Sequence, residues 1–400
     1  MKEYIDRPQA QRNRIIAIIN EVLFALFVFF FYIIFQRDLI ALMQETWSHG
    51  QTSNNPVVTA LVVLVVLLLV QRAVRAITRL HGRWDAFTWV PSFMLLSLST
   101  SVQLPSLSFR LRSWAIVGVV VIAVLYAVVF ISHAFHSDKK TPLANLLCPN
   151  LVVIVLSALV CMELTNHDAA LHQELAAFRH ADRGETERVA DVGRRSLETT
   201  PMLTALRNVA LVQTDRAGDE LFRYPQPLRS DGLGVEHFLR QDTRFGSDAF
   251  YRFLGEEPYG GESAAVFCER IYRQDDTPFH RNLYIASLLL DCRLSDFASE
   301  FPPSQMLAES VHVDSLPRHY REAWVLASYL YRDKDMLVDY DDPEMQSLFN
   351  EFRSSLNSSH RTVHETLNEL FLTYGKTYWY YYYRETTSLT DDSHTNVPKK

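Results

Sequence analysis

Glycine is scarce in this chain, with 13 residues in 400, and cysteine is scarcer still, with four. A low glycine content, together with helical spacing of the apolar residues, favours helices over tight turns and sheet edges. Four cysteines are too few for a small fold built on disulfides. No catalytic or cofactor-binding motif stands out, so we expect no cofactor, and the sequence predicts an architecture more readily than an activity.

Charge divides the chain near Glu163. Residues 1–163 carry 13 Lys/Arg against 8 Asp/Glu, a net charge of +5, whereas residues 164–400 carry 26 against 38, a net charge of −12. A break this sharp predicts a domain boundary. The acidic balance of the second half argues against nucleic acid as a partner.

Long apolar runs fill the first half, for which we expect the lipid bilayer to be the partner. They predict five membrane-spanning helices, at residues 15–35, 56–77, 86–103, 114–132 and 145–163. The first run is too long for a signal peptide and lacks a small-residue cleavage site after it, which predicts an uncleaved anchor. The third run is the least apolar, because it contains Pro91 and several Ser and Thr residues.

The distribution of Lys and Arg predicts the orientation. With a cytoplasmic N-terminus, only Arg37, Arg110 and Arg112 fall outside, and ten basic residues of this half fall inside. Five spans then predict an integral inner-membrane protein whose second half is periplasmic, if the organism is Gram-negative. A re-entrant third segment would instead place the second half in the cytoplasm.

Charged groups within the spans are scarce, which argues against a proton-coupled transporter. Glu21 lies inside the first span. Its carboxylate could pair with Arg72 or Arg75, or it could lie among the lipid headgroups.

Helical spacing of apolar residues continues through residues 164–385, with short Pro-, Gly- and Asp-containing joints between helices. Paired helices of this kind predict a stack of α-hairpins similar to tetratricopeptide repeats, although the full consensus is missing. The expected fold is therefore all-α, a polytopic transmembrane helical domain over residues 1–163 followed by an α-hairpin-repeat domain. Residues 386–400, rich in Thr, Ser and Asp, are expected to form a disordered tail.

Three segments of the second half carry a resemblance to a known group of proteins. They are Ala205–Gln226, with its Asp219-Glu220-Leu221-Phe222-Arg223-Tyr224-Pro225 stretch, Leu316–Ala323, and Tyr378–Tyr383. These segments resemble uncharacterised multipass membrane proteins of the Bacteroidales. The resemblance implies an N-terminal membrane domain followed by a helical-repeat domain in a Gram-negative envelope, and it implies no activity.

Two pairs of residues in the second half could bind a metal or each other. His360 and His364 stand four residues apart on one helix face, a spacing that can bind Zn²⁺, although a solvated polar face explains them as well. Cys268 and Cys292 could form a disulfide in an oxidising compartment, or they could be two buried free thiols.

The segment Tyr378, Trp379, Tyr380, Tyr381, Tyr382 and Tyr383 is unusually aromatic. Consecutive residues of a helix point in all directions, so these rings cannot all face one core. They predict either an interaction surface for a partner, a glycan or the headgroup zone, or a terminal helix packed between repeats.

We expect an inner-membrane scaffold or binding protein that presents the helical domain to an envelope protein or a peptide. The alternative is a glycosyltransferase-like membrane enzyme that uses a lipid-linked sugar. Its catalytic carboxylate would lie in the first external loop, where the chain has Asp38 and Glu45.

Overall fold

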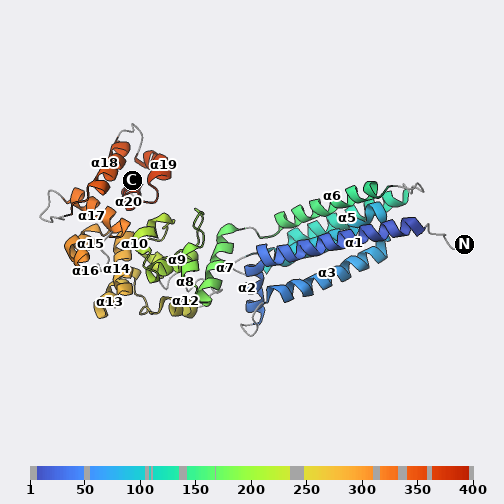
Figure 1. Ribbon diagram of the computed structural model, residues 1–400, viewed down its shortest axis with the longest axis horizontal. Helices are drawn as coiled ribbons and strands as arrows, with labels where there is room; N and C mark the ends of the chain where they lie inside the picture. Colours follow the sequence, from blue (N-terminus) through green and yellow to red (C-terminus); the bar gives the residue numbers. More distant parts are fainter. Residues whose placement is uncertain are drawn as a thin grey trace, which may run out of the picture. The chain divides into compact units, whose positions relative to one another are not determined.

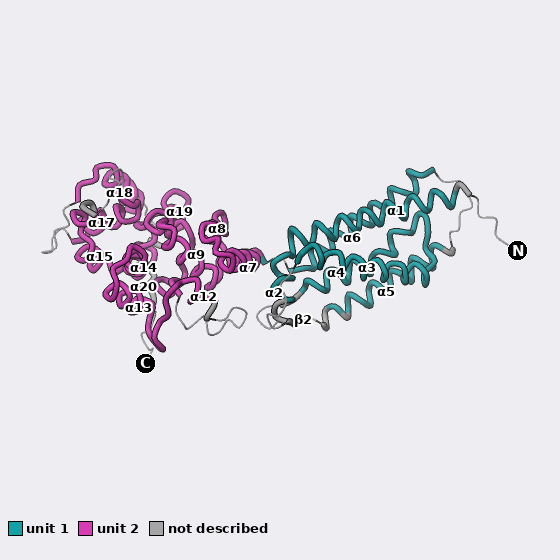
Figure 2. Tube along the Cα trace, turned by 60° about the horizontal axis from the view of Figure 1, so that its bottom comes forward, with its two compact units in different colours: residues 1–168 teal, residues 169–400 magenta. Residues whose placement is uncertain are grey.

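The computed structural model describes residues 7–48, 55–103, 108–109, 111–134, 142–166, 168–234, 247–309, 316–331, 340–357 and 363–395. The chain divides into two compact units, Met1–Asp168 and Ala169–Lys400 (Figure 2). The boundary predicted near Glu163 lies just before this division. Helices make up almost all of the described secondary structure, apart from one short antiparallel pair, β1 (Val102–Gln103) and β2 (Ser108–Phe109).

Unit 1 contains three helices that are long and apolar enough to cross a membrane (Figure 1). They are α1 (Arg7–Phe30) with its π-helical continuation η1 (Phe31–Phe35), α3 (Pro56–Thr78) and α6 (Leu143–Leu164). A fourth helix, α5 (Leu111–Ala134), contains a shorter apolar stretch, Ile116–Ser132. The predicted spans 56–77 and 145–163 agree closely with α3 and α6, whereas α1 begins well before residue 15.

The third predicted span is not one continuous α-helix. The chain forms a 3₁₀-helix, η2 (Gly82–Trp89), and then the 11-residue α4 (Val90–Thr100). Pro91 lies in the first turn of α4, where its missing N–H costs no hydrogen bond. The prediction of a single helix over 86–103 is therefore wrong, and this segment is not among the three long apolar helices.

Hydrogen bonds at both ends of unit 1 fix the direction of its segments. At one end Asn20 of α1 donates to Asp85 of η2 and to Asn150 of α6. Toward the other end the Tyr32 hydroxyl lies 3.1 Å from that of Ser99, and the side chain of Gln36, just after η1, donates at 3.2 Å to the carbonyl of Asn166, just after α6. Because α1, η2–α4 and α6 run in the same direction, α3 and α5, which connect them, must run back.

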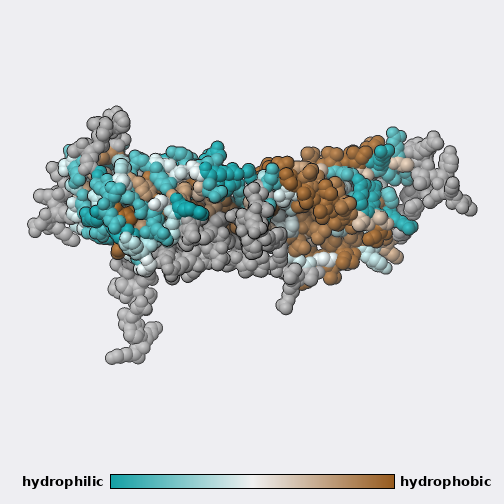
Figure 3. Space-filling view, turned by 90° about the horizontal axis from the view of Figure 1, so that it is seen from below, coloured by the Kyte–Doolittle hydropathy of each residue, from teal (hydrophilic) through white to brown (hydrophobic). Residues whose placement is uncertain are grey.

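The outer surface of unit 1 is apolar. Large side chains such as Leu26, Leu69 and Val152 are each more than 60 % exposed, and apolar residues make up much of the face of unit 1 seen in Figure 3. Such a surface is unfavourable in water and favourable in hydrocarbon. This surface and the three long apolar helices together indicate a membrane protein.

Unit 2 is a set of short helices around one core. In chain order they are α7 (Ala169–Asp182), α8 (Thr186–Asp191), α9 (Pro201–Gln213), α10 (Ala217–Glu220) with η3 (Leu221–Arg223), η4 (Arg229–Leu233), α12 (Ser247–Leu254), α13 (Ala264–Gln274), α14 (Pro278–Leu290), α15 (Leu294–Glu300), α16 (Pro303–Glu309), α17 (Arg318–Leu330), α18 (Pro343–Asn357), α19 (Val363–Tyr374) and α20 (Tyr378–Thr395). Because α20 continues to Thr395, most of the predicted tail is helical, and residues 396–400 lie outside the described residues.

Two helices of unit 2, α9 and α14, begin in the same way, 77 residues apart. The hydroxyl of Thr200 caps α9 by accepting a hydrogen bond from the Leu203 amide, and the hydroxyl of Thr277 caps α14 by accepting from the His280 amide. In both helices proline occupies the first position. A hydroxyl cap followed by proline is a strong local signal for a helix start.

The same two helices also end in the same way. Asp215 and Cys292 both adopt the left-handed conformation, with φ of 57° and 58°. The next amide, of Arg216 or Arg293, donates at 2.8 Å to a carbonyl five residues earlier, which is the Schellman pattern. The two stretches share further residues at the same spacing, namely Leu206/Leu283, Leu211/Leu288, Asp219/Asp296 and Pro225/Pro302. Unit 2 therefore contains a duplicated helix-and-turn motif.

Candidate functional site

Glu322, on α17, is a fully buried carboxylate with three bonding partners. Its Oε1 accepts a hydrogen bond from Arg318 Nε at 2.8 Å. Its Oε2 lies 3.0 Å from His319 Nδ1 and accepts from the backbone N–H of Tyr378 at 2.7 Å. The carboxylate therefore joins α17 to the first residue of α20.

Aromatic side chains complete this site, which we call the Glu322 cluster (Phe222, His319, Glu322, Tyr378 and Trp379). Trp379 donates from its indole N–H to the Glu322 carbonyl at 2.7 Å. The Phe222 ring of η3 lies 5.0 Å from the His319 ring and 5.1 Å from the Tyr378 ring. Three helical segments far apart in the sequence, η3, α17 and α20, thus meet in one place.

These are the same three segments that carry the family resemblance. Besides the contacts of Phe222, the Asp219 carboxylate accepts from the Arg318 backbone N–H at 2.7 Å. Gly218 packs directly against Pro317, so that an added Cβ would collide with the proline ring. The three segments, which are far apart in the sequence, therefore form one packed region.

Changing Gly218 to Ala should destabilise the protein by about 1–3 kcal/mol, because the new methyl group has to displace Pro317. The matched control is Gly260→Ala, since an added Cβ there meets no atom within 4 Å. Thermal unfolding of the full chain in detergent measures both variants. Equal midpoints for the two variants would show that the contact between Gly218 and Pro317 is unimportant.

A buried carboxylate beside a histidine resembles the base-orienting part of a catalytic site. Here, however, the side chains of His319 and Glu322 are 1 % and 0 % exposed, so a substrate could not reach them. His319 Nε2 and the Tyr378 hydroxyl are also buried, without a hydrogen-bond partner among the described residues. Burial raises the pKa of Tyr378 well above its usual value, so its hydroxyl stays protonated. We interpret the Glu322 cluster as a polar joint between helices.

Unit 1 has a second buried polar site, centred on Asn150 of α6. Its Oδ1 accepts from the Ala86 amide at 2.7 Å, and its Nδ2 donates to the Gly82 carbonyl at 2.9 Å and to the Leu146 carbonyl. Both ends of its side chain are therefore bonded, and two of these bonds hold the backbone of η2. A fourth bond to this side chain is donated by Asn20 Nδ2 to Asn150 Oδ1 at 3.3 Å.

Asp85 is the charged member of this site, which we call the Asn150 cluster (Asn20, Arg75, Asp85 and Asn150). One carboxylate oxygen accepts from Asn20 Nδ2 at 2.9 Å, and the other lies 2.9 Å from Arg75 Nη2. The Asp85 side chain is 1 % exposed. A charge buried to this extent among apolar helices requires a partner, and Arg75 supplies it.

A comparison with protein-family models identifies the chain. The model of DUF6057, a family of unknown function, matches residues 9–255 and 265–385. The chain belongs to DUF6057. The match covers most of unit 1 as well as unit 2 and includes every residue of the two clusters, so the resemblance to an uncharacterised family is confirmed. Neither the curated proteins nor the solved structures contain a match to this chain.

In this DUF6057 protein, Asn20, Asp85 and Asn150 form a site that we did not predict from the sequence. The available signal was two asparagines inside apolar spans and an aspartate between Trp84 and Trp89. Of the alternatives for Glu21, the structure shows a pair with Arg72 at 2.7 Å, partly exposed on the surface of unit 1.

The predicted catalytic and metal-binding residues are only partly described. Asp38 lies in the first turn of α2 (Arg37–Ser48), a helix in place of the expected loop, and the side chain of Glu45 lies outside the described part. His360 lies outside the described residues, as does the side chain of His364 on α19. Within the described part of the chain, no group of three His, Cys, Asp or Glu residues could hold a metal ion.

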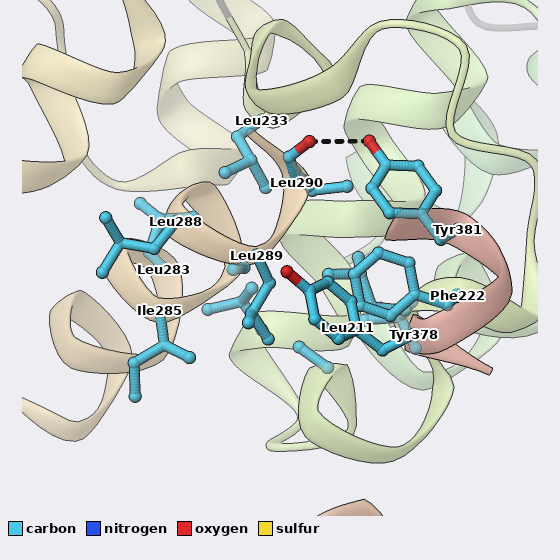
Figure 4. Close-up of a cluster of buried hydrophobic side chains, with 14 of the residues drawn as sticks. Leu211, Phe222, Leu233, Leu283, Ile285, Leu288, Leu289, Leu290, Tyr378 and Tyr381 are labelled. Atoms are coloured by element: carbon cyan, nitrogen blue, oxygen red, sulfur yellow. Dashed lines mark hydrogen bonds between the residues drawn. The ribbon is translucent and has the colours of Figure 1, made fainter. Parts of the chain in front are cut away.

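The aromatic segment lies mainly inside unit 2. Tyr378, Trp379, Tyr380 and Tyr381 are each at most 4 % exposed, and the Tyr381 hydroxyl donates to the Leu290 carbonyl at 2.7 Å (Figure 4). Only Tyr382 and Tyr383 are partly exposed. The four buried residues therefore belong to the core and cannot form the interaction surface that we considered.

Cys268 and Cys292 are free thiols, the first buried and the second partly so, and the disulfide alternative does not occur in the structure. Burial raises the pKa of Cys292 to about 12 and raises that of Cys268 above its usual value. At pH 8 both thiols are therefore protonated and poorly nucleophilic.

We expect iodoacetamide at pH 8 to leave both cysteines unmodified in the folded protein and to modify both after denaturation. Mass spectrometry of the two peptides gives the modified fractions, and the denatured sample is the control. Equal labelling in both states, or a peptide pair linked through Cys268 and Cys292, would contradict this assignment.

Proposed function

We propose that this DUF6057 protein is a membrane-anchored scaffold that presents unit 2 to another molecule. The observation that supports this role is that the central polar side chains of the two clusters, Glu322, Asp85 and Asn150, are bonded within the protein. Glu322, Asp85 and Asn150 join helices to one another, as expected for groups that build a rigid body rather than perform a reaction. A rigid unit attached to a membrane anchor is suited to binding.

For the location, we propose the inner membrane, with a cytoplasmic N-terminus and a periplasmic unit 2. Two features of unit 1 support this orientation. Arginines gather at the end that contains Asn20, as is typical of cytoplasmic ends. In this arrangement α1, η2–α4 and α6 cross the membrane in one direction, and α3 and α5 cross it in the other. The last crossing, α6, would then end on the side opposite the arginines, just before unit 2 begins.

For the binding partner, we propose an envelope protein or a peptide. The duplicated motif of α9 and α14 supports a hairpin-repeat architecture of the tetratricopeptide kind for unit 2. Stacks of helical hairpins present extended surfaces that bind peptides and proteins.

Photo-crosslinking of the full chain in its native membrane tests this role. A photoreactive amino acid replaces Leu197, Tyr259 or Leu372, three exposed apolar side chains of unit 2. We expect a discrete protein adduct from at least one of these positions. Replacement of Leu26, an exposed residue of α1, is the control and should give lipid adducts. Absence of any discrete protein adduct from unit 2 would contradict the scaffold role.

The enzymatic alternative has one observation in its favour. The helix that carries Asp38 is held in place by the buried side chains of Leu39, Leu42 and Met43, so that the carboxylate has a defined position. An enzyme that uses a lipid-linked sugar could employ such a group. Loss of the cellular phenotype in Asp38→Asn or Glu45→Gln, at normal protein levels, would favour this alternative over the scaffold.

A further inference from the structure

One end of unit 1 carries four arginines that lack an acidic partner among the described residues. They are Arg12 and Arg14 at the start of α1, Arg79 just after α3, and Arg83 in η2, and we call them the arginine rim. Among the described residues near this end, the carboxylates of Glu21 and Asp85 are already paired, with Arg72 and Arg75 respectively. The rim therefore has an excess of positive charge.

Contacts between the segments bring the four arginines to the same end. Gly82, between Arg79 and Arg83, packs against Asn13, which lies between Arg12 and Arg14, and an added Cβ on Gly82 would come within 3.0 Å of Asn13 Oδ1. Gly82 has a φ of +62°, a conformation that suits glycine. The start of α1 and the turn before η2 are thus in contact.

The chemistry of the rim is that of an anion site beside an apolar surface. Arg12 Nε is buried and has no hydrogen-bond partner in the described part of the chain, and the Arg83 guanidinium lies 5.8 Å from the centre of the Trp84 ring. Beside the arginines, Ile18 of α1 and Ile77 of α3 are 51 % and 82 % exposed. A soluble anion would use only the guanidinium groups, whereas a phospholipid would use these groups and also cover the isoleucines.

We propose that the arginine rim binds the headgroup of an anionic phospholipid, whose acyl chains lie against Ile18 and Ile77. Guanidinium groups bind phosphate oxygens through charge-assisted hydrogen bonds, and several of them on one surface favour an anionic over a zwitterionic lipid. This inference rests on the insertion of unit 1 in a bilayer and does not depend on the scaffold role.

Native mass spectrometry of the full chain tests the proposal directly. The protein is released from nonionic detergent micelles that contain equal amounts of phosphatidylglycerol and phosphatidylcholine. We expect retained adducts of phosphatidylglycerol to exceed those of phosphatidylcholine severalfold. The variant Arg79→Gln/Arg83→Gln should lose this preference, whereas the control variants Arg37→Gln, in α2, and Arg194→Gln, on the surface of unit 2, should keep it.

Thermal unfolding in the same micelles provides the second measurement. Phosphatidylglycerol should raise the unfolding midpoint of the native protein more than phosphatidylcholine does, because a ligand of the folded state stabilises it. This difference should shrink in the double variant and at high salt. An equal rise with both lipids, or a rise with inorganic phosphate as large as that with phosphatidylglycerol, would overturn the proposal.

Discussion

Replacing Glu322 with glutamine should lower the free energy of unfolding by about 3–5 kcal/mol, the usual result of removing one partner from a buried charged network. Glutamine keeps the shape of the side chain but places an NH₂ group where the carboxylate now accepts from Arg318, or from His319 and the Tyr378 amide. One of these donors would then lose its acceptor. Denaturant unfolding of the full chain in detergent, followed by tryptophan fluorescence, measures the change.

The matched control is Glu344→Gln on α18. Glu344 also pairs with an arginine, Arg321, but its side chain is 74 % exposed. Exposed pairs contribute little, so this variant should stay within about 0.5 kcal/mol of the native protein. If Glu322→Gln were as stable as Glu344→Gln, the Glu322 cluster would not join α17 to α20 as we describe.

Replacing Asn150 with leucine should cost about 2–4 kcal/mol, because two backbone groups of η2 lose their partner. The Ala86 amide and the Gly82 carbonyl both bond to the Asn150 side chain inside unit 1. Each unsatisfied buried group costs about 1–3 kcal/mol, because the lost hydrogen bond is not readily replaced inside a membrane domain. We expect a lower thermal unfolding midpoint of the full chain in detergent.

Asn145→Leu, on the same helix, is the control for this prediction. Asn145 is exposed, so the same change in chemistry there should leave the midpoint almost unchanged. A stable Asn150→Leu variant would mean that η2 is held by its other contacts, such as the Asp85–Arg75 pair, and that Asn150 is dispensable.

The apolar runs at residues 56–77 and 145–163 could be predicted almost to the residue, because length and hydropathy alone determine such helices. The segment around Asp85 could not. Its aspartate and arginine look too polar for a membrane span when each is considered alone, and only the fold shows that Asp85 pairs with Arg75 and that Asn150 bonds the backbone beside it.

In unit 2, too, local helices could be predicted from the sequence but contacts between distant segments could not. The helical spacing and the Thr-Pro starts at Thr200 and Thr277 predict where helices form. The aromatic run from Tyr378 predicted either an interaction surface or a terminal helix packed between repeats, since six consecutive rings cannot share one face. Burial of four of them depends on acceptors from distant elements, among them the Glu322 carbonyl for Trp379 and the Leu290 carbonyl for Tyr381. Local sequence contains no sign of these acceptors.

The central proposal is that unit 1 crosses the membrane an odd number of times and so separates the arginine rim from unit 2. Fusions of alkaline phosphatase and of green fluorescent protein after Lys400 of the full chain, expressed in a Gram-negative host, test it most directly. We predict that the alkaline phosphatase fusion is active and that the green fluorescent protein fusion does not fluoresce. Fluorescence from the green fluorescent protein fusion, together with an inactive alkaline phosphatase fusion, would place unit 2 on the same side as the arginine rim and contradict the proposal.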